Sequence, residues 1–369
     1  MVTMEYMEHA LSLARISIGH VSPNPAVGAV IVRDDKIVGE GYTQPPPGMH
    51  AEIVAVKNAG DKSKKATMYV TLEPCAHYGR TSPCADAIIA AGITEVHIAT
   101  LDDNPLVRGR GVSKLEEAGL RVVVGECEEE ARQINECYIK YITTGLPFIT
   151  VKYAMSVDGK MATRSGDSKW ISNDDSRNFS HNLRYVSDAI MVGVNTVLID
   201  DPHLTARSGH GHGGAFKKQP VRVIVDDAGR TPLSANIFKN PGKTIVLLGR
   251  KAKESEKTAF MEASDAELVE MPAEGGLVDL RSSMEYLAER GITSIMVEGG
   301  SMILGSMFDL GLVDKVLAFV APIVIGGSGA KTPVAGFGAD RVMSAIKLDR
   351  VSVTTFGEDT LITGYVKKD

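Results

Sequence analysis

The fold of the first half of the chain is decided by the stretch Glu73-Pro74-Cys75-Ala76-His77-Tyr78-Gly79-Arg80-Thr81-Ser82-Pro83-Cys84. Its two cysteines have eight residues between them, and a histidine precedes them in the run Met49-His50-Ala51-Glu52. One imidazole and two thiolates can hold a zinc ion and leave its fourth position open for water. We therefore predict that His50, Cys75 and Cys84 ligate one Zn²⁺.

Glu52 follows the histidine by two residues at the start of a predicted helix, so its carboxylate can overhang the open position of the metal. A glutamate that does not ligate is typical of zinc deaminases, in which activated water attacks a carbon bearing an exocyclic amine. We expect Glu52 to take a proton from that water and to return it to the leaving ammonia.

Non-catalytic interpretations of the predicted zinc site are less favoured, and the remaining cysteines and histidines are given no metal. A structural zinc site prefers four protein ligands, and the neighbouring candidate, His77, suits a substrate contact better. Cys127 and Cys137 lie on an acidic helix without a partner motif and are expected to be structural. His203, His210 and His212 are expected to face solvent, because two of them lie in a Gly-rich loop without acidic or thiolate partners.

Length and charge limit the class of protein. A chain of 369 residues favours two domains. The net charge is −6, and residues 1–146 carry 14 basic against 19 acidic side chains, so neither half has the positive excess that a polynucleotide needs. The apolar run 316–325 is too short to cross a bilayer and is expected to be a buried strand. Without a signal-peptide pattern or a disulfide framework, a cytoplasmic protein is expected.

Strand and helix signals alternate in the first half, which indicates an α/β domain with a mixed sheet. Helices are expected at 3–17, 50–59, 84–91, 111–118 and 126–142, and strands at 27–32, 36–42, 68–72, 95–100 and 121–124. Thr144-Gly145-Leu146-Pro147 interrupts this pattern. We therefore expect domains at 1–146 and 147–369.

The second half alternates in the same way. Strands are expected at 148–154, 188–193, 221–226, 244–248, 294–297 and 315–320, and helices near 173–185, 279–290 and 300–309. Two late strands, about 350–356 and 360–367, have no helix between them and predict an antiparallel hairpin at a sheet edge. Residues 207–219 are expected to form a mobile loop. A G-x-G-x-x-G motif between a strand and a helix is lacking, which disfavours a Rossmann domain.

The chain as a whole resembles the bifunctional riboflavin-biosynthesis deaminase–reductase (RibD) family. Matching runs in the first half, besides those around the predicted zinc ligands, are Ser22–Val30 and Asp103–Gly111. Those in the second half are Lys152–Lys160, Trp170–Ser172, His181–Arg184, Val192–Val197, Asp200–Arg207 and Val297–Ser301. The runs follow one another in family order over nearly the whole chain.

The resemblance implies a cytidine-deaminase-like three-layer α/β/α domain followed by a dihydrofolate-reductase-like α/β domain. The first would hydrolyse the 2-amino group of a diaminopyrimidinone that carries a phosphoribosylamino arm. The second would use NADPH to reduce the ribosyl group of that product to ribityl. The implied ligands are thus one Zn²⁺, NADPH and a small phosphorylated pyrimidine, and the resemblance also implies a homo-oligomer.

The resemblance also implies which residues form the two sites. In the deaminase, those expected to bind substrate are Asn24, His77 and Arg80, the last at the phosphate. In the reductase, those expected to bind substrate are Ser168, Arg184, Leu204, Arg207 and Glu298, with both arginines suited to phosphate. Those expected to bind NADPH are Ala154, Trp170, Thr196, Asp200, Asp227, Gly299, Gly300, Ser301, Met302, Ile303, Leu304 and Gly305.

Several of these assignments have alternatives. Trp170 could instead be a core residue, and Asn24, His77 and Arg80 ordinary loop residues. Thr43 stands where the family usually has histidine, which weakens the expected grip on the phosphate. Asp227 stands where the family often has serine, and only a backbone contact would tolerate its charge beside a phosphorylated cofactor. The general acid of the reductase step is not predicted.

Two rival functions are weighed against this one. A deaminase of bases in nucleic acid would share the zinc chemistry, but the charge balance, the long cysteine spacing and the large second domain disfavour it. A protein with one inactive scaffold domain is disfavoured because the residues of both sites are intact.

Overall fold

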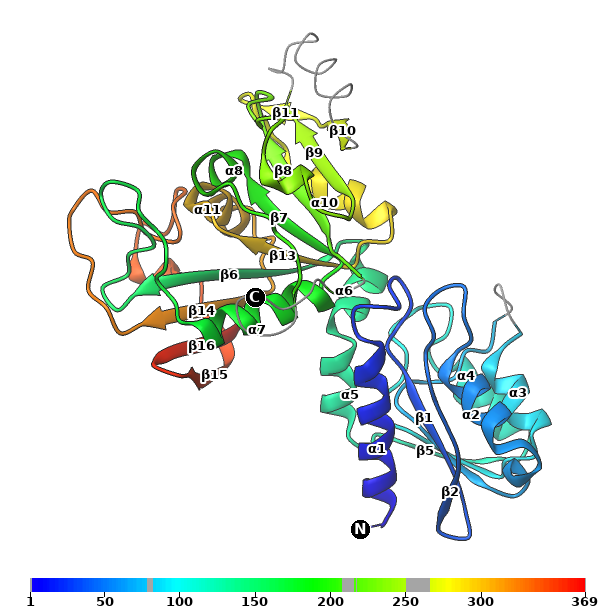
Figure 1. Ribbon diagram of the computed structural model, residues 1–369. Helices are drawn as coiled ribbons and strands as arrows, with labels where there is room; N and C mark the ends of the chain where they lie inside the picture. The colour runs from blue at the N-terminus through cyan, green and yellow to red at the C-terminus, as the bar shows by residue number, and fades with distance from the viewer. Residues whose placement is uncertain (1, 78–81, 208–215, 217, 250–265, 369) are drawn as a thin grey trace. The chain divides into compact units, whose positions relative to one another are not determined.

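The computed structural model describes residues 2–77, 82–207, 216, 218–249 and 266–368. The chain divides into two compact units, residues 1–146 and 147–369, and each is described by itself (Figure 1). Among the described residues, no helix is long and apolar enough to cross a membrane.

The first unit contains a five-stranded sheet in the order β2 (Lys36–Tyr42), β1 (Gly28–Arg33), β3 (Thr67–Val70), β4 (Glu95–Ile98), β5 (Arg121–Val124). Strand β1 is antiparallel to β2 and β3, whereas β3, β4 and β5 are parallel. The sheet is therefore mixed, as expected. Its helices are α1 (Val2–Ser17), α2 (Ala51–Ala59), α3 (Cys84–Ala90), α4 (Arg110–Glu117), α5 (Glu128–Ile134) and α6 (Glu136–Thr144), with a 3₁₀ turn at Gly60–Ser63.

Helices cover both faces of this sheet because successive strand side chains point to opposite sides. Ala29 and Ile31 pack in one core cluster with residues of α2, α3 and α4. Val30 and Val32 pack in another cluster with residues of α1 and α5. The predicted three-layer α/β/α arrangement is confirmed, and Figure 1 shows α1 and α5 together on one side of the strands.

The single helix predicted over 126–142 is wrong, because the structure has two helices that meet at Asn135. The buried Asn135 amide pairs with the backbone of Ala26, accepting from its N–H at 2.8 Å and donating to its carbonyl at 3.0 Å. Cys127 also differs from the prediction, because it does not lie within a helix. It is the residue before α5, and its backbone is left-handed (φ 58°).

The second unit contains a nine-stranded sheet. Its order is β10 (Glu267–Glu270), β9 (Thr244–Leu248), β8 (Val221–Asp226), β7 (Ala189–Gly193), β13 (Ser294–Glu298), β6 (Phe148–Ser156), β14 (Lys315–Ala321), β16 (Asp359–Val366), β15 (Leu348–Phe356). The first seven are parallel, and β16 and β15 form the predicted antiparallel hairpin at one edge. The predicted buried strand in 316–325 is β14, although it ends at Ala321.

The helices of this unit include α7 (Asp174–Val186), α10 (Leu280–Glu289) and α11 (Ser301–Asp309), close to where they are predicted. Short elements without a clear sequence signal are α8 (Val194–Asp200), β11 (Ala273–Glu274), β12 (Leu277–Val278) and 3₁₀ turns at Asn236–Phe238 and Val342–Ser344. Helix α8 is rich in β-branched residues, which favour strands locally. It forms a helix that buries Val194 and Val197, which are three residues apart and lie on one face.

Candidate active sites

The three predicted zinc ligands of the first unit come together. His50 lies at the start of α2, Cys84 is the first residue of α3, and Cys75 follows the end of β3. His50 Nδ1 lies 3.2 Å from Cys84 Sγ and 3.8 Å from Cys75 Sγ, and the three ligand atoms all lie within 4.8 Å of one another. This spacing fits a tetrahedral zinc ion with Zn–N near 2.0 Å and Zn–S near 2.3 Å. Among the described residues, no other group of this kind is assembled.

Glu52 is buried beside these ligands. It shares a cavity of about 450 Å³ with His50, Cys75, Asn24 and His77. Burial and, second, the negative charge of Cys75 raise the pKa of Glu52 to about 7. Hydrogen bonds from the Cys84 thiol and the His50 ring lower the pKa of Cys75, which favours the thiolate. A proton-accepting group and a thiolate thus line the same cavity.

Arg80, the predicted phosphate contact of this unit, lies outside the described residues. Thr43 lines the cavity but is buried, and its hydroxyl accepts a hydrogen bond from the backbone N–H of Val27 at 3.2 Å. The threonine hydroxyl is therefore hydrogen-bonded within the protein.

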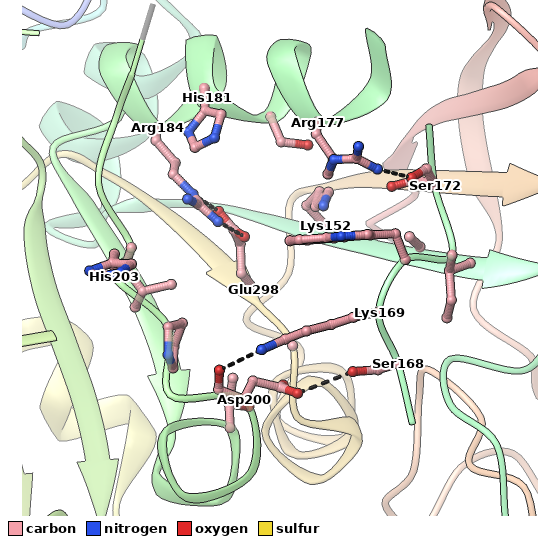
Figure 2. A pocket seen from close by; sticks show the side chains of 18 of the residues that line it. Lys152, Ser168, Lys169, Ser172, Arg177, His181, Arg184, Asp200, His203 and Glu298 are labelled. Carbon is pink, nitrogen blue, oxygen red and sulfur yellow. Dashed lines mark hydrogen bonds and ion pairs between the residues drawn. The ribbon is translucent and has the colours of Figure 1, made fainter. Parts of the chain in front are cut away.

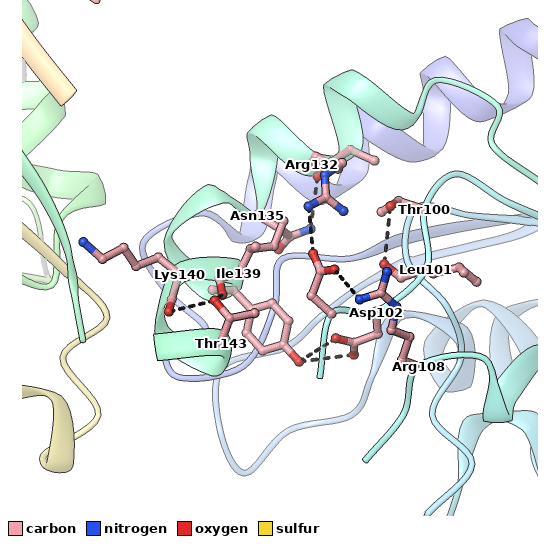
Figure 3. A network of polar contacts seen from close by, with 12 residues as sticks. Thr100, Leu101, Asp102, Arg108, Arg132, Asn135, Ile139, Lys140 and Thr143 are labelled. Atoms are coloured by element: carbon pink, nitrogen blue, oxygen red, sulfur yellow. Dashed lines mark hydrogen bonds and ion pairs between the residues drawn. The ribbon is translucent and has the colours of Figure 1, made fainter. Parts of the chain in front are cut away.

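Sequence reasoning missed two groups that build this cavity. The buried Glu73 carboxylate accepts four backbone N–H groups at 2.9–3.2 Å, from Asp102, Gly109, Gly111 and Val112. It thereby ties the loop that carries Cys75 to the start of α4. On the cavity wall, the Tyr138 hydroxyl donates to the Asp102 carboxylate at 3.0 and 3.1 Å (Figure 3). Burial raises the pKa of Asp102 to about 6.

The second unit has a larger cavity of about 810 Å³ beside the carboxyl ends of β6 and β13 (Figure 2). Residues from both predicted sets line it. Those from the substrate set are Ser168, Arg184, Leu204, Arg207 and Glu298, and those from the cofactor set are Ala154, Trp170, Thr196, Asp200 and Gly299. Lys152, Arg177 and His181 also line the cavity, although the residue pattern gave them no role.

Arg184 and Glu298 form a two-point ion pair within this cavity. Arg184 Nε donates to Glu298 Oε1 at 2.6 Å and Nη2 donates to Oε2 at 2.7 Å, while Nη1 donates to the Thr205 carbonyl at 3.2 Å. Burial raises the pKa of Glu298, but the charge and hydrogen bonds of Arg184 outweigh it and lower the pKa to about 2. All three nitrogens of Arg184 thus have protein partners, whereas the buried Arg207 Nε has none among the described residues.

Trp170 is not a core residue, because its side chain is 70% exposed and lines the cavity. The Arg177 guanidinium lies over its ring, 4.6 Å from the centroid. Asp200 accepts from the Ser168 hydroxyl at 3.1 Å, and Lys169 Nζ donates to its backbone carbonyl at 2.9 Å (Figure 2). Asp227 does not line the cavity; its carboxylate accepts from the backbone N–H of Val278 at 2.7 Å.

The turn before α11 fits a phosphorylated cofactor. Gly299 and Gly300 have left-handed φ values of 70° and 77°, and a Cβ on Gly300 would lie 3.1 Å from Thr196 Oγ1. Two residues without side chains therefore precede the first backbone N–H groups of α11. Backbone N–H groups at the start of a helix are suited to bind a pyrophosphate. Gly305 differs, because a Cβ there would lie 2.2 Å from the Ala335 carbonyl oxygen and α11 packs directly on that backbone. Gly300 to Gly305 do not line the cavity itself.

His203 is exposed at the rim of the reductase cavity, and its Nδ1 pairs with Asn240 Nδ2 at 2.8 Å. His210 and His212, with most of the predicted mobile loop, lie outside the described residues.

Comparison with known proteins assigns both units. Residues 147–362 match the model of the RibD C-terminal domain. Residues 2–100 match that of the cytidine and deoxycytidylate deaminase zinc-binding region. The riboflavin biosynthesis protein RibD of Aquifex aeolicus is 42% identical over 361 residues, which are 98% of each chain. The chain belongs to the RibD family.

Solved structures agree with this assignment. Acinetobacter baumannii RibD has a TM-score of 0.86 and 33% identity, covering 100% of this chain and 99% of that one. A Thermotoga maritima diaminohydroxyphosphoribosylaminopyrimidine deaminase/5-amino-6-(5-phosphoribosylamino)uracil reductase has a TM-score of 0.82 and 34% identity, covering 99% of each chain. The chain is therefore a bifunctional riboflavin-biosynthesis enzyme, with a cytidine-deaminase-like zinc domain and a dihydrofolate-reductase-like domain.

Proposed function

We propose that residues 1–146 deaminate 2,5-diamino-6-(5-phosphoribosylamino)pyrimidin-4-one to 5-amino-6-(5-phosphoribosylamino)uracil, and that residues 147–369 reduce its ribosyl group to ribityl with NADPH. The observation that carries the first step is the buried Glu52 in one cavity with His50 and Cys75, whose donor atoms lie within 4.8 Å of that of Cys84. The second step is supported by the cavity that Arg207, Glu298 and Gly299 share.

In the deaminase, His50, Cys75 and Cys84 hold the zinc ion. The bound ion supplies Lewis acidity, which lowers the pKa of water from ~15.7 to ~7. Glu52 accepts a proton as water oxygen adds to the ring carbon, and it returns that proton to the amine as the carbon–nitrogen bond breaks. Water is consumed and ammonia is released. Asn24 and His77 line the same cavity and orient the pyrimidine, and Arg80 binds its phosphate.

In the reductase, bound NADPH would supply the hydride for reduction of the ribosyl group. The Gly299-Gly300 turn and the amides that open α11 bind its pyrophosphate, and Ala154, Trp170, Thr196 and Asp200 lie along the cavity it enters. Arg207 binds the substrate phosphate, because it lines the same cavity and no carboxylate among the described residues pairs with it. Arg184 holds Glu298 in the same cavity through both of its carboxylate oxygens. Positioning of the two reactants supplies much of the rate.

A two-step assay on the full chain tests the proposal. The diaminopyrimidine substrate should release ammonia first, and NADPH should be oxidised only after that release. Glu52→Gln should prevent both events with this substrate, yet it should oxidise NADPH normally when the deaminated intermediate is supplied. Oxidation of NADPH by the undeaminated substrate at the same rate would contradict the assigned order.

The family also supports a homo-oligomer that acts in the cytoplasm. Light scattering on the purified enzyme measures the first property, and fractionation of the native host measures the second.

A further inference from the structure

The two arginines of the reductase cavity are held in different ways. Arg184 is neutralised by Glu298, whereas no carboxylate among the described residues pairs with Arg207. The described partner of the Arg207 guanidinium is His181, whose Nε2 lies 3.2 Å from Arg207 Nη2. Figure 2 shows His181 on α7 beside Arg184, facing the cavity.

The second contact of His181 fixes its tautomer. His181 Nδ1 lies 3.0 Å from the Thr205 carbonyl oxygen, which can only accept, so Nδ1 carries the proton. Nε2 then has a free lone pair that accepts from Arg207. Burial and the charges of Arg184 and Arg207 lower the pKa of His181 to about 4, so the ring stays neutral at physiological pH.

We propose that His181 is a positioning residue for the reductase: its neutral imidazole accepts from Arg207 and turns the remaining guanidinium donors toward the phosphate of the substrate. The proposal rests on the proposed phosphate role of Arg207. The Thr205 carbonyl holds the His181 ring in place. It accepts hydrogen bonds from both His181 and Arg184, which lie on adjacent turns of α7. His181 therefore contributes to the preference for a phosphorylated substrate without touching it.

Two substitutions separate positioning from packing. His181→Asn places an amide N–H near the Nδ1 position and keeps the contact with Thr205, but it removes the acceptor for Arg207. His181→Gln places an amide oxygen near the Nε2 position and keeps that acceptor, but it removes the donor to Thr205. If Thr205 alone matters, Gln should be the more harmful change; if Arg207 matters, Asn should be.

The experiment measures reductase kinetics of the full-length enzyme with the phosphorylated deaminated intermediate, with its dephosphorylated form, and with varied NADPH. His181→Asn should raise the KM for the phosphorylated intermediate by roughly 10-fold, the size expected for a hydrogen bond to a charged group. The KM for the dephosphorylated form and for NADPH should change less than about 2-fold, and His181→Gln should restore most of the loss.

Arg207→Ala and the double variant complete the test. Arg207→Ala should remove the preference for phosphate, and His181→Asn should add nothing in that background. If Arg207→Ala acts but His181→Asn does not, or acts equally in both backgrounds, the positioning role is overturned while the proposed function stands. If Arg207→Ala leaves the preference intact, the phosphate role of Arg207 falls and the inference falls with it.

Discussion

The Arg184 guanidinium and the Glu298 carboxylate form a two-point ion pair inside the reductase cavity, with N–O distances of 2.6 and 2.7 Å. Arg184 comes from α7 and Glu298 ends β13, 114 residues later. The pair therefore fixes the helix to the sheet at the place where the substrate is expected.

Removal of the arginine should destabilise the second unit. Arg184→Met leaves the Glu298 charge buried without its partner, and breaking such a pair costs about 3–5 kcal/mol. Glu298→Gln in the Arg184→Met background should recover part of this loss, because it removes the isolated charge. Urea unfolding of the parent and the two variants at pH 7 measures the free energies of unfolding. An Arg184→Met protein as stable as the parent would show that the pair contributes nothing.

Glu52→Gln should reduce ammonia release by at least 10²-fold, because proton transfer by a positioned side chain contributes 10²–10⁴-fold. The amide is nearly isosteric, so zinc content measured by atomic emission should be unchanged. Normal NADPH oxidation with the deaminated intermediate serves as the internal control. Rapid ammonia release by this variant would rule out the role of Glu52.

Loss of one thiolate should separate the two activities. In Cys75→Ser the zinc content and ammonia release should both fall, since the remaining donors hold zinc poorly. Cys137→Ser is the matched control, because Cys137 lies on α6 and is not one of the three clustered ligands. This variant should keep both its zinc content and its ammonia release. The prediction fails if Cys75→Ser binds one zinc per chain as tightly as the parent.

Asp102 should give the first unit a pH-dependent stability. Its pKa is raised by burial to about 6 from an ordinary value near 4, so the folded form binds the proton more tightly than the unfolded form. Stability should then fall as the pH rises from about 4 to about 6. In Asp102→Asn this contribution should be absent, which chemical unfolding at several pH values would detect. Parallel pH curves for parent and variant would contradict the assignment.

NADPH binding should quench the fluorescence of Trp170. This residue is the only tryptophan of the chain, and its exposed ring lines the reductase cavity. The nicotinamide absorbs where tryptophan emits, so a nearby cofactor should produce a saturable loss of emission. Calorimetry gives the same affinity independently. Saturable binding by calorimetry with unchanged emission would place the cofactor away from Trp170.

The sequence predicted those parts of the fold and site that local patterns determine. The strand predicted over 27–32 is β1, and the His50 and Cys75 runs predicted ligands that meet. The break at Asn135 was not predictable, because it depends on the backbone of Ala26, 109 residues away. The same holds for the Tyr138–Asp102 contact across 36 residues. The ion pair of Arg184 likewise depends on a partner, Glu298, from a distant strand.

Gly305 has a consequence for how variants of the glycine-rich stretch should be understood. Its hydrogen faces the carbonyl of Ala335, and a methyl group there would collide with that oxygen. Any side chain at this position would separate α11 from the chain at Ala335. Substitution of Gly305 should therefore give a poor yield of folded protein. The fraction that does fold should bind nucleotide with unaltered affinity, and this phenotype distinguishes Gly305 from Gly299.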